Sequence, residues 1–437
     1  MTSTWLIYGA PAAAFVGFYL SRRRQDERQA RIIRDEAIEA GLTEPASLHP
    51  VIDPAKCIGC ATCVRACPEQ SVLGVINGKA DLIGPTHCIG HGACAAACPV
   101  GAIDLVFGTE RRGVDIPQVS PTFETNVPGI FIAGELGGMG LIRNAITQGR
   151  QAMEAIAARV KSAAADAVPA GVMDVAVIGA GPAGFAASLA AKEKGLSFVT
   201  LEQETFGGTV AHYPRGKIVM TAPVVLPIVG KMQFSETTKE ELLEFWQGIR
   251  RRTNLQVHYS ERVTSIGRRG GYFEITTEKN SYKARNVLLA IGRRGTPRKL
   301  EVAGETLPKV VYRLIDPEQY KDQDVLVVGG GDSALEAAAS LAEVPGTLVS
   351  LSYRGDAFGR AKQKNRERVR AAQAAGRLRV YLKSAVVAID QDAVTLEHDG
   401  ERKVLRNDAI IVCAGGILPT GFLKEIGVAV DTKYGTR

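Results

Sequence analysis

Cysteine is almost absent from this sequence outside one short stretch. Seven of the eight cysteines lie between Cys57 and Cys98, and Cys413 stands alone near the carboxyl end. Such clustering in a long chain excludes a scaffold of scattered disulfides and indicates metal binding in a reducing compartment. We expect Cys413, which lies in an apolar strand, to be a buried and inert thiol.

A strong excess of one charge is also absent. The net charge of +7 is modest for 437 residues and does not by itself indicate nucleic acid, so we expect no nucleic acid partner. With 46% hydrophobic and 23% charged residues, the composition excludes a disordered chain. The length exceeds what one hydrophobic core supports, so roughly two to four domains are expected.

Long uncharged runs are missing except at the amino terminus. Residues 4–20 carry no charge over 17 positions, and three arginines follow at 22–24. This length is the lower limit for a membrane span, and arginines after an apolar run keep the following chain in the cytoplasm. The sequence predicts a single-pass anchor at 1–21 in the cytoplasmic membrane, with the main body on the cytoplasmic side and a charged helical stalk at 22–50. A signal peptide and a buried or interfacial helix are the alternatives.

The clustered cysteines form two copies of one spacing pattern. The first copy fits C-x2-C-x2-C-x3-C-P, and the second follows 31 residues later with histidine at its second position. Thiolates at this spacing wrap an iron–sulfur cube, and the fourth cysteine of each copy reaches the other cube. Zinc is the disfavoured alternative, because it rarely takes eight ligands in two interlocked sets. The candidate metal ligands are Cys57, Cys60, Cys63, Cys67, Cys88, His91, Cys94 and Cys98.

These motifs make residues 51–108 resemble a bacterial two-cluster 2[4Fe-4S] ferredoxin, a small α+β module. The resemblance implies that a [4Fe-4S] cluster one binds Cys98 and the first three cysteines, and that cluster two binds Cys67, Cys88 and Cys94. His91 departs from the pattern. It can ligate the fourth iron of a [4Fe-4S] cluster, leave an empty corner in a [3Fe-4S] cluster, or lie on the surface without binding. A neutral ligand in place of a thiolate should raise the cluster's potential.

A glycine motif begins after the predicted strand at 175–178. Gly179, Gly181 and Gly184 fit G-x-G-x-x-G, in which the glycines permit a tight turn, approach to a pyrophosphate and helix–strand packing. The pyrophosphate would lie at the amino terminus of the alanine-rich helix that follows. Glu202 ends the second predicted strand, where an acid can hold a ribose. We therefore predict a dinucleotide site rather than a bare glycine turn.

A second motif of this kind begins at Asp324. It fits G-x-G-x-x-A, and we interpret its second strand as ending on Arg354, where the first ended on Glu202. Arginine at this place suits a 2′-phosphate, whereas an acid suits a free ribose, so NADPH is weakly favoured over NADH. The predicted NAD(P) residues are Gly329, Gly331, Ala334, Arg354 and Arg360.

The residues after Glu202, FGGTV at 206–210 and then His-Tyr-Pro, resemble the loop beside the flavin in thioredoxin-reductase-like FAD/NAD(P) flavoproteins of the pyridine nucleotide-disulfide oxidoreductase superfamily. That family ends in a strand reading PGIFAAGD and a helix. Here the similar segments, at 125–136 and 140–160, precede the first glycine motif, so we interpret the chain as a circular permutant. The alternative is an unrelated helical region at 113–160. The resemblance places at the flavin Gly134, Glu135, Arg143, Ala145, Gly207, Gly208 and Thr209.

Together the motifs predict an α/β fold with two Rossmann-like nucleotide-binding domains, for FAD and NAD(P), a ferredoxin-like module and one membrane helix. The predicted activity is that of an NAD(P)H:acceptor oxidoreductase that moves electrons, in either direction, through FAD and two iron–sulfur clusters. The partner would be a one-electron carrier or redox subunit, and the chain a homodimer or a subunit of a larger complex. The predicted segments are 1–21, 22–50, 51–108, 109–160 (permuted FAD half), 161–171 (linker), 172–296 (FAD), 297–410 (NAD(P)) and 411–437 (return to the FAD domain).

Two other functions remain open from the sequence. A thiol-disulfide reductase would need a redox cysteine pair, and residues 311–320, ahead of the second glycine motif, contain none. A redox-sensing or assembly protein would bind the same cofactors without steady turnover.

Overall fold

The structure is a computed structural model of the 437-residue chain. It describes all residues except 1, 40–42, 46–47, 70, 89, 91, 111–112, 139, 163–168, 170, 214, 221–222, 234–235, 294, 360, 362 and 436–437. The chain divides into two compact units, which are described separately below. One comprises residues 1–114, 359–363 and 433–437, and the other comprises 115–358 and 364–432.

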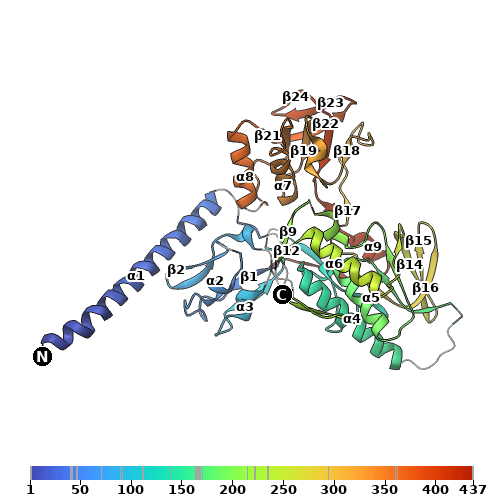
Figure 1. The fold of residues 1–437 in the computed structure, drawn as a ribbon, viewed down its shortest axis with the longest axis horizontal. Coiled ribbons are helices and arrows are strands. Elements are labelled where there is room, and N and C mark those ends of the chain that lie inside the picture. The colour runs from blue at the N-terminus through green and yellow to red at the C-terminus, as the bar shows by residue number, and fades with distance from the viewer. Residues whose placement is uncertain are drawn as a thin grey trace. The chain divides into compact units, whose positions relative to one another are not determined.

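The first unit contains a small α+β module built on two short antiparallel strand pairs (Figure 1). A short helix carries the cysteine at the third position of each pattern, Cys63 in the first and Cys94 in the second. Each begins after a residue in the left-handed conformation, Ala61 with φ 58° and Gly92 with φ 75°, which turns the chain into the helix. The elements are β1 (His49–Ile52) paired with β4 (Ile103–Val106), β2 (Leu73–Ile76) paired with β3 (Lys79–Leu82), α2 (Thr62–Ala66), η1 (Pro85–His87) and α3 (Ala93–Ala96).

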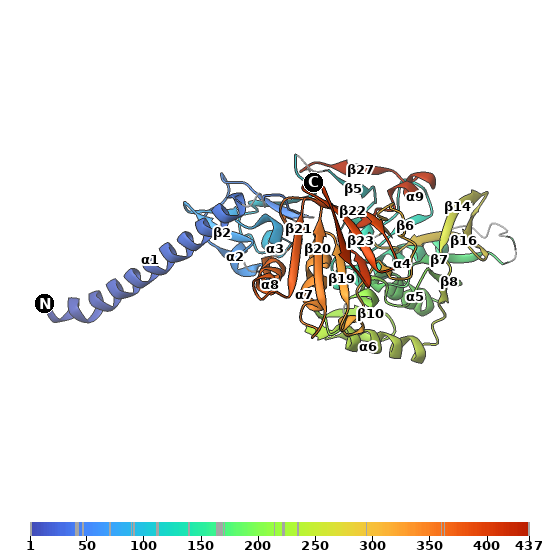
Figure 2. The same ribbon diagram turned by 90° about the horizontal axis from the view of Figure 1, so that it is seen from above.

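One long helix, α1 (Thr2–Glu39), precedes this module (Figure 2). Its second half packs on the β2–β3 hairpin, because Ala30 is buried against Ile76 and Ile83. The backbone N–H of Asn77 also donates a hydrogen bond of 3.0 Å to the Glu27 carboxylate. Part of the segment predicted to be a charged stalk is therefore fixed to the module.

The predicted membrane anchor is wrong. Among the residues that the structure describes, no helix has both the length and the apolar character needed to cross a membrane. The uncharged run at 4–20 is only 17 residues long and includes Trp5, Tyr8, Gly9 and Pro11, which lower its mean hydropathy. The single-pass location in the cytoplasmic membrane fails with the anchor.

The second unit contains two large sheets, and the first of these is a seven-stranded mixed sheet (Figure 1). Its parallel strands are nearly continuous apolar runs, as expected for strands covered on both faces. Val175, Val177 and Leu288, for example, have no exposed surface. The strands are β13 (His258–Tyr259), β8 (Phe198–Glu202), β7 (Met173–Ile178), β16 (Ser281–Leu289), β15 (Tyr272–Thr277) and β14 (Val263–Arg269) in sheet order, with β6 (Ile130–Ile132) also parallel to β16.

Three helices accompany this sheet: α4 (Ile142–Ser162), α5 (Pro182–Glu193) and α6 (Lys239–Arg252). The alanine-rich α5 is buried along most of its length and lies beside α4 (Figure 1). A side chain at Gly149 of α4 would overlap the carbonyl oxygen of Ala183, so the two helices approach closely. Helix α6 begins with a capping box formed by Thr238 and Glu241.

The second sheet has five parallel strands, and a three-stranded antiparallel sheet follows it along the chain. Both large sheets have the strand–helix–strand order of the predicted α/β fold, which is confirmed. The five strands, in sheet order, are β18 (Val310–Val311), β25 (Ala409–Val412), β19 (Asp324–Val328), β20 (Leu348–Tyr353) and β21 (Leu378–Leu382); the other elements are α7 (Asp332–Leu341), α8 (Gln363–Ala374), β22 (Ser384–Ile389), β23 (Ala393–His398) and β24 (Glu401–Arg406).

Short strand pairs and turns of 3-10 helix connect these layers. The pairs are β5 (Val114–Pro117) with β27 (Val430–Lys433), β9 (Ile218–Met220) with β12 (Glu236–Thr238), β10 (Val224–Leu226) with β11 (Gly230–Met232) and β17 (Thr296–Pro297) with β26 (Gly416–Ile417). The remaining helices are η2 (Glu135–Gly137), η3 (Gly208–His212), η4 (Pro317–Tyr320) and α9 (Thr420–Glu425).

Residues 115–162, which we call the early segment, pack with parts of the chain that come much later. Besides the β6–β16 pairing, the Asn126 side chain donates to the carbonyl oxygen of Gly427 at 2.9 Å and accepts from the N–H of Ala429 at 2.8 Å. The early segment therefore completes the first sheet and borders the carboxyl-terminal residues of the same unit.

The approach of α4 to α5 predicts opposite effects for two helical glycines. Gly149→Ala should destabilise the protein by about 1–3 kcal/mol, because its methyl group forces the helices apart. The methyl group of Gly248→Ala in α6 would meet no other atom within 4 Å. This substitution should therefore stabilise the protein by about 0.5–1 kcal/mol, because alanine has the higher helix propensity. Thermal unfolding of the two variants and the parent measures both effects. A Gly149→Ala variant as stable as the parent would contradict the close packing of the early segment.

Candidate functional site

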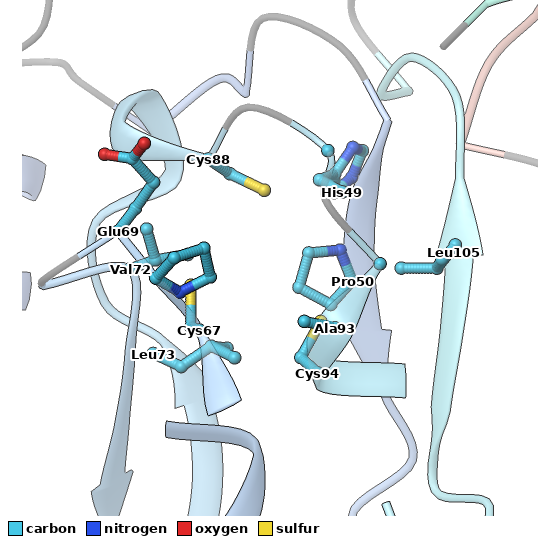
Figure 3. Close-up of a pocket in the computed structure, with 13 residues that line it drawn as sticks. His49, Pro50, Cys67, Glu69, Val72, Leu73, Cys88, Ala93, Cys94 and Leu105 are labelled. Atoms are coloured by element: carbon cyan, nitrogen blue, oxygen red, sulfur yellow. The ribbon is translucent and has the colours of Figure 1, made fainter. Parts of the chain in front are cut away.

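Two cysteine-lined cavities lie in the ferredoxin-like module. One is lined by Cys57, Cys60 and Cys63 of the first cysteine pattern together with Cys98, the last cysteine of the second. The other is lined by Cys88 and Cys94 of the second pattern together with Cys67 of the first, and the three side chains surround one space in Figure 3. His91 lies outside the described residues.

Hydrogen bonds reach three sulfurs of the first cavity. The backbone N–H of Ala80 donates to Sγ of Cys57 at 3.4 Å, and that of Ala102 donates to Sγ of Cys98 at 3.3 Å. The Thr62 hydroxyl donates to Sγ of Cys60 at 3.3 Å and lowers the pKa of that exposed thiol. Such donors favour the thiolate form, which is the form that binds metal.

The other thiols are held in apolar surroundings. Burial raises the pKa of Cys63, Cys67 and Cys94, and it raises the pKa of Cys88 to about 11. A buried thiolate is costly unless a cation compensates its charge, and a coordinated metal deprotonates its thiol outright. The soft donors, their enclosure and the N–H groups around them therefore fit iron–sulfur clusters. Within the described part of the chain, no three His, Cys, Asp or Glu side chains are grouped to hold a single metal ion.

A third cavity, of about 760 Å³, lies in the second unit beside the carboxyl ends of β7, β8 and β16. Its size falls in the range of cofactor sites. The structure brings together here most of the residues that the sequence predicted for FAD. Those that line this cleft are Gly134, Glu135, Ala145, Gly179, Gly181, Glu202, Gly208 and Thr209.

Three predicted FAD residues do not line the cleft. A side chain at Gly184 would overlap the carbonyl oxygen of Gly179, so Gly184 allows α5 to pack against its own strand. Gly207 has φ 103°, and its N–H donates to the carbonyl oxygen of Ala180 at 3.0 Å. Arg143 is exposed and does not contribute to the lining.

Glu202 holds the glycine turn directly. Its carboxylate accepts hydrogen bonds from the N–H of Ala180 at 2.7 Å and from that of Glu204 at 2.9 Å, and only 6% of the residue is exposed. Burial raises its pKa, although both N–H groups act in the opposite direction. A buried acid at this place, facing a cavity, fits the hydroxyl groups of a ribose.

The sequence did not reveal a charged cluster in the same cleft. Both terminal nitrogens of Arg313 donate hydrogen bonds to the Glu204 carboxylate, at 2.7 and 2.8 Å. Nε2 of His212 lies 2.9 Å from Oε2 of the same carboxylate. The Arg313 guanidinium holds the pKa of Glu204 below its usual range. These three residues share no local pattern, and Arg313 is more than 100 positions from Glu204. Only the tertiary fold brings them together.

The second glycine turn resembles the first in backbone geometry. Gly329 has φ 144°, and a side chain there would overlap the carbonyl oxygen of Cys413. Ala334 is fully buried in the first turn of α7. Gly331 precedes α7 and has open space around it, as a backbone that approaches a phosphate requires. Cys413 is partly exposed rather than buried as we expected.

The predicted end of the second strand is wrong by one residue. Ile178 pairs with Leu201 in the first sheet, so Glu202 comes next; Val328 pairs with Ser352 in the second, so Tyr353 comes next. Strand β20 ends at Tyr353, and Arg354 follows it as an exposed residue. Arg360 lies outside the described residues. An aromatic ring therefore stands where the first site has its acid.

Comparison with known proteins matches the two parts of the chain to two families. The family model described as pyridine nucleotide-disulphide oxidoreductase matches residues 176–436, more than half of the chain. The chain belongs to this family. A second family model, described as a 4Fe-4S dicluster domain, matches residues 49–99.

Curated and solved relatives agree with this membership. A ferredoxin–NADP reductase of Ignicoccus hospitalis is 30% identical over 60% of this chain and 83% of its own. The bacilliredoxin reductase Bdr of Bacillus subtilis is 27% identical over 59% of this chain and 82% of its own. The structure of the bacillithiol disulfide reductase Bdr (YpdA) from Staphylococcus aureus superposes with a TM-score of 0.51 at 28% identity, covering 59% of this chain and 80% of that one.

These findings confirm the predicted class of enzyme. This family member is an NAD(P)H-dependent flavin oxidoreductase that also carries a 4Fe-4S dicluster domain. FAD, NAD(P)H and iron–sulfur clusters are therefore the types of cofactor that this protein uses.

The position of Glu202 predicts a selective loss of flavin. Glu202→Arg should give protein with little FAD but unchanged iron content, because it removes the acid that bonds Ala180 and places a cation in the cleft. The absorbance of released flavin measures the FAD content, and an iron assay measures the iron content. Glu425→Arg, which changes an exposed glutamate that also lines the cleft, is the matched control and should retain FAD. Full flavin occupancy in Glu202→Arg would remove Glu202 from the FAD site.

Proposed function

We propose that this oxidoreductase passes electrons between NAD(P)H and a one-electron carrier or partner redox subunit. The observation that carries the proposal is that one chain contains both a flavin-sized cleft and two cysteine-lined cavities. When bound, FAD exchanges hydride with NAD(P)H and single electrons with iron–sulfur clusters, so the pair converts two-electron into one-electron chemistry.

In this proposal the first glycine turn binds FAD. The amino terminus of α5, which begins at Pro182 after Gly181, would hold the pyrophosphate with its unpaired N–H groups. Glu202 would hold the adenosine ribose, and Gly134, Glu135 and Thr209 would contact the remainder of the cofactor. The Glu204–Arg313 pair, which bonds at 2.7 and 2.8 Å, would fix one wall of the cleft.

The ferredoxin-like module would hold two clusters through crossed ligand sets. Cys57, Cys60, Cys63 and Cys98, which line one cavity, would bind an ordinary [4Fe-4S] cluster. Cys67, Cys88 and Cys94, which line the other, would bind the second cluster. His91 would be the fourth ligand of that cluster or leave a three-iron centre, and iron stoichiometry separates these two states.

We further propose that the flavin domain is circularly permuted. In support, the family model begins only at residue 176, whereas β6 at 130–132 pairs with β16 of the same sheet. The early segment also bonds to Gly427 and Ala429, where the chain is near its end. Under this proposal 109–160 and 411–437 both belong with the FAD domain at 172–296, and 297–410 forms the NAD(P) domain.

A thiol-disulfide reductase is the second candidate, because two relatives with that activity in their names are similar over more than half of this chain. It has less support, since Cys413 is the single cysteine of the matched flavoprotein region. Cys413→Ser should leave NAD(P)H oxidation with ferricyanide unchanged under our proposal, whereas a disulfide reductase that uses this thiol would lose disulfide reduction.

Anaerobic titration with NADPH and with NADH tests the proposal. We expect the flavin absorbance to bleach and cluster signals to appear in electron paramagnetic resonance within the same titration, because one chain would bind both the flavin and the clusters. Rapid reduction of a one-electron acceptor should accompany them. Flavin bleaching without any cluster signal or acceptor reduction would contradict the electron path, and a chain that oxidises neither nucleotide would be a sensor or assembly protein.

The histidine of the second pattern gives a further prediction. His91→Cys supplies a fourth thiolate and should lower the potential of the second cluster, because the added negative charge favours its oxidised form. Iron analysis measures the number of iron atoms per chain, and a redox titration measures the potential of the second cluster. Seven irons in the parent and eight in the variant would identify an empty corner. Eight irons in both proteins with the same potential would contradict a role for His91 at the cluster.

A further inference from the structure

We propose that Tyr353 sets the nucleotide selectivity of the second glycine turn, leaving Arg354 as the basic side chain among residues 353–359 that can distinguish NADPH from NADH. The inference rests on the proposed binding of NAD(P)H at this turn. It is carried by the register of β19 and β20 and by the packing of the Tyr353 ring.

The two glycine turns can be superposed residue by residue through their hydrogen bonds. The N–H of Gly179 donates to the carbonyl oxygen of Leu201 at 2.7 Å, and the N–H of Gly329 donates to that of Ser352 at 2.9 Å. The next residue is Glu202 in the first site and Tyr353 in the second. Tyr353 is therefore the structural counterpart of the acid.

The Tyr353 ring is enclosed on several sides. A side chain at Gly330, inside the glycine turn, would overlap one edge of the ring. A Cβ atom at Gly355 would lie 2.6 Å from Cε1 and 2.8 Å from Cζ on the other edge. The ring also stacks on Phe358, with centroids 5.7 Å apart and planes 22° from parallel.

This packing explains two glycines that the nucleotide motif does not require. Gly330 occupies a variable position of G-x-G-x-x-A, and Gly355 follows the strand. Neither has the left-handed φ that would demand glycine for backbone reasons. The ring itself excludes side chains at both positions, so position 355 cannot provide a second basic group beside Arg354.

The chemistry of selectivity follows from these places. An acid at the strand end accepts hydrogen bonds from a free ribose and repels a 2′-phosphate. Tyr353 is neutral, so it neither repels the phosphate nor supplies a carboxylate to the ribose. Arg354, exposed and next in the chain, can make a charge-assisted contact to the phosphate. One such contact gives a moderate preference for NADPH while NADH is still bound.

Five variants of the intact holoenzyme test this assignment, with binding of NADP+ and NAD+ measured directly beside kcat/KM for NADPH and NADH. Tyr353→Glu should shift the selectivity ratio toward NADH by about tenfold or more, since it restores the acid. Gly355→Arg should weaken the binding of both nucleotides, because the new side chain displaces the Tyr353 ring. Tyr353→Ala with Gly355→Arg removes that clash and should favour NADPH by about tenfold over Tyr353→Ala alone.

Tyr353→Phe keeps the ring and is the matched control for its hydroxyl group, so its selectivity ratio should stay within about twofold of the parent. FAD content, which reports on the separate first turn, shows whether each variant is folded. The assignment is overturned if Tyr353→Glu leaves the ratio unchanged, or if Gly355→Arg improves NADPH selectivity equally with and without Tyr353. Binding that follows these expectations without any nucleotide oxidation would contradict the proposed function and still support the role of Tyr353.

Discussion

The flavin half of this protein depends on backbone contacts that no side chain can enter. Gly184 brings α5 against the carbonyl oxygen of Gly179, and Gly149 brings α4 against that of Ala183. The amino terminus of α5 is thereby fixed between its own strand and a helix from the early segment. A helix end held so firmly presents its N–H groups in a constant position, which is what a pyrophosphate site requires. Packing and cofactor binding are thus one constraint.

An analogous dependence joins the two cavities of the ferredoxin-like module. Cys67 and Cys98 each line the cavity of the other cysteine pattern, so neither cavity is completed by its own segment. Both side chains are partly buried against a small core, and burial raises the pKa of the Cys67 thiol, which disfavours the charged form that binds iron. Cluster binding would therefore stabilise both halves of the module together, since metal sites of this kind contribute directly to folding.

Sequence patterns predicted most reliably what is encoded by neighbouring residues. The glycine motifs and cysteine spacings specify local turns, and the structure forms both turns and brings the cysteines together in two sets. The membrane anchor failed because an uncharged run is not necessarily apolar enough for a span. The Arg313–Glu204 pair and the place of Tyr353 depend on tertiary contacts and strand register, and a shift of one residue in register changes which side chain meets the ligand.

If FAD binds at the first glycine turn and NAD(P)H at the second, as proposed, the difference between the two strand ends would let one nucleotide stay bound and the other leave. In the first turn, the Glu202 carboxylate accepts a hydrogen bond from the N–H of Ala180 and remains buried. A ribose that binds Glu202 would therefore make its hydrogen bonds in an enclosed place. In the second, a neutral ring covers Gly330 and the charged group is an exposed arginine. An exposed charge contact is weakened by water and salt, whereas an enclosed contact is screened much less. A permanently held FAD fits the first arrangement, and a nucleotide that must leave after each turnover fits the second.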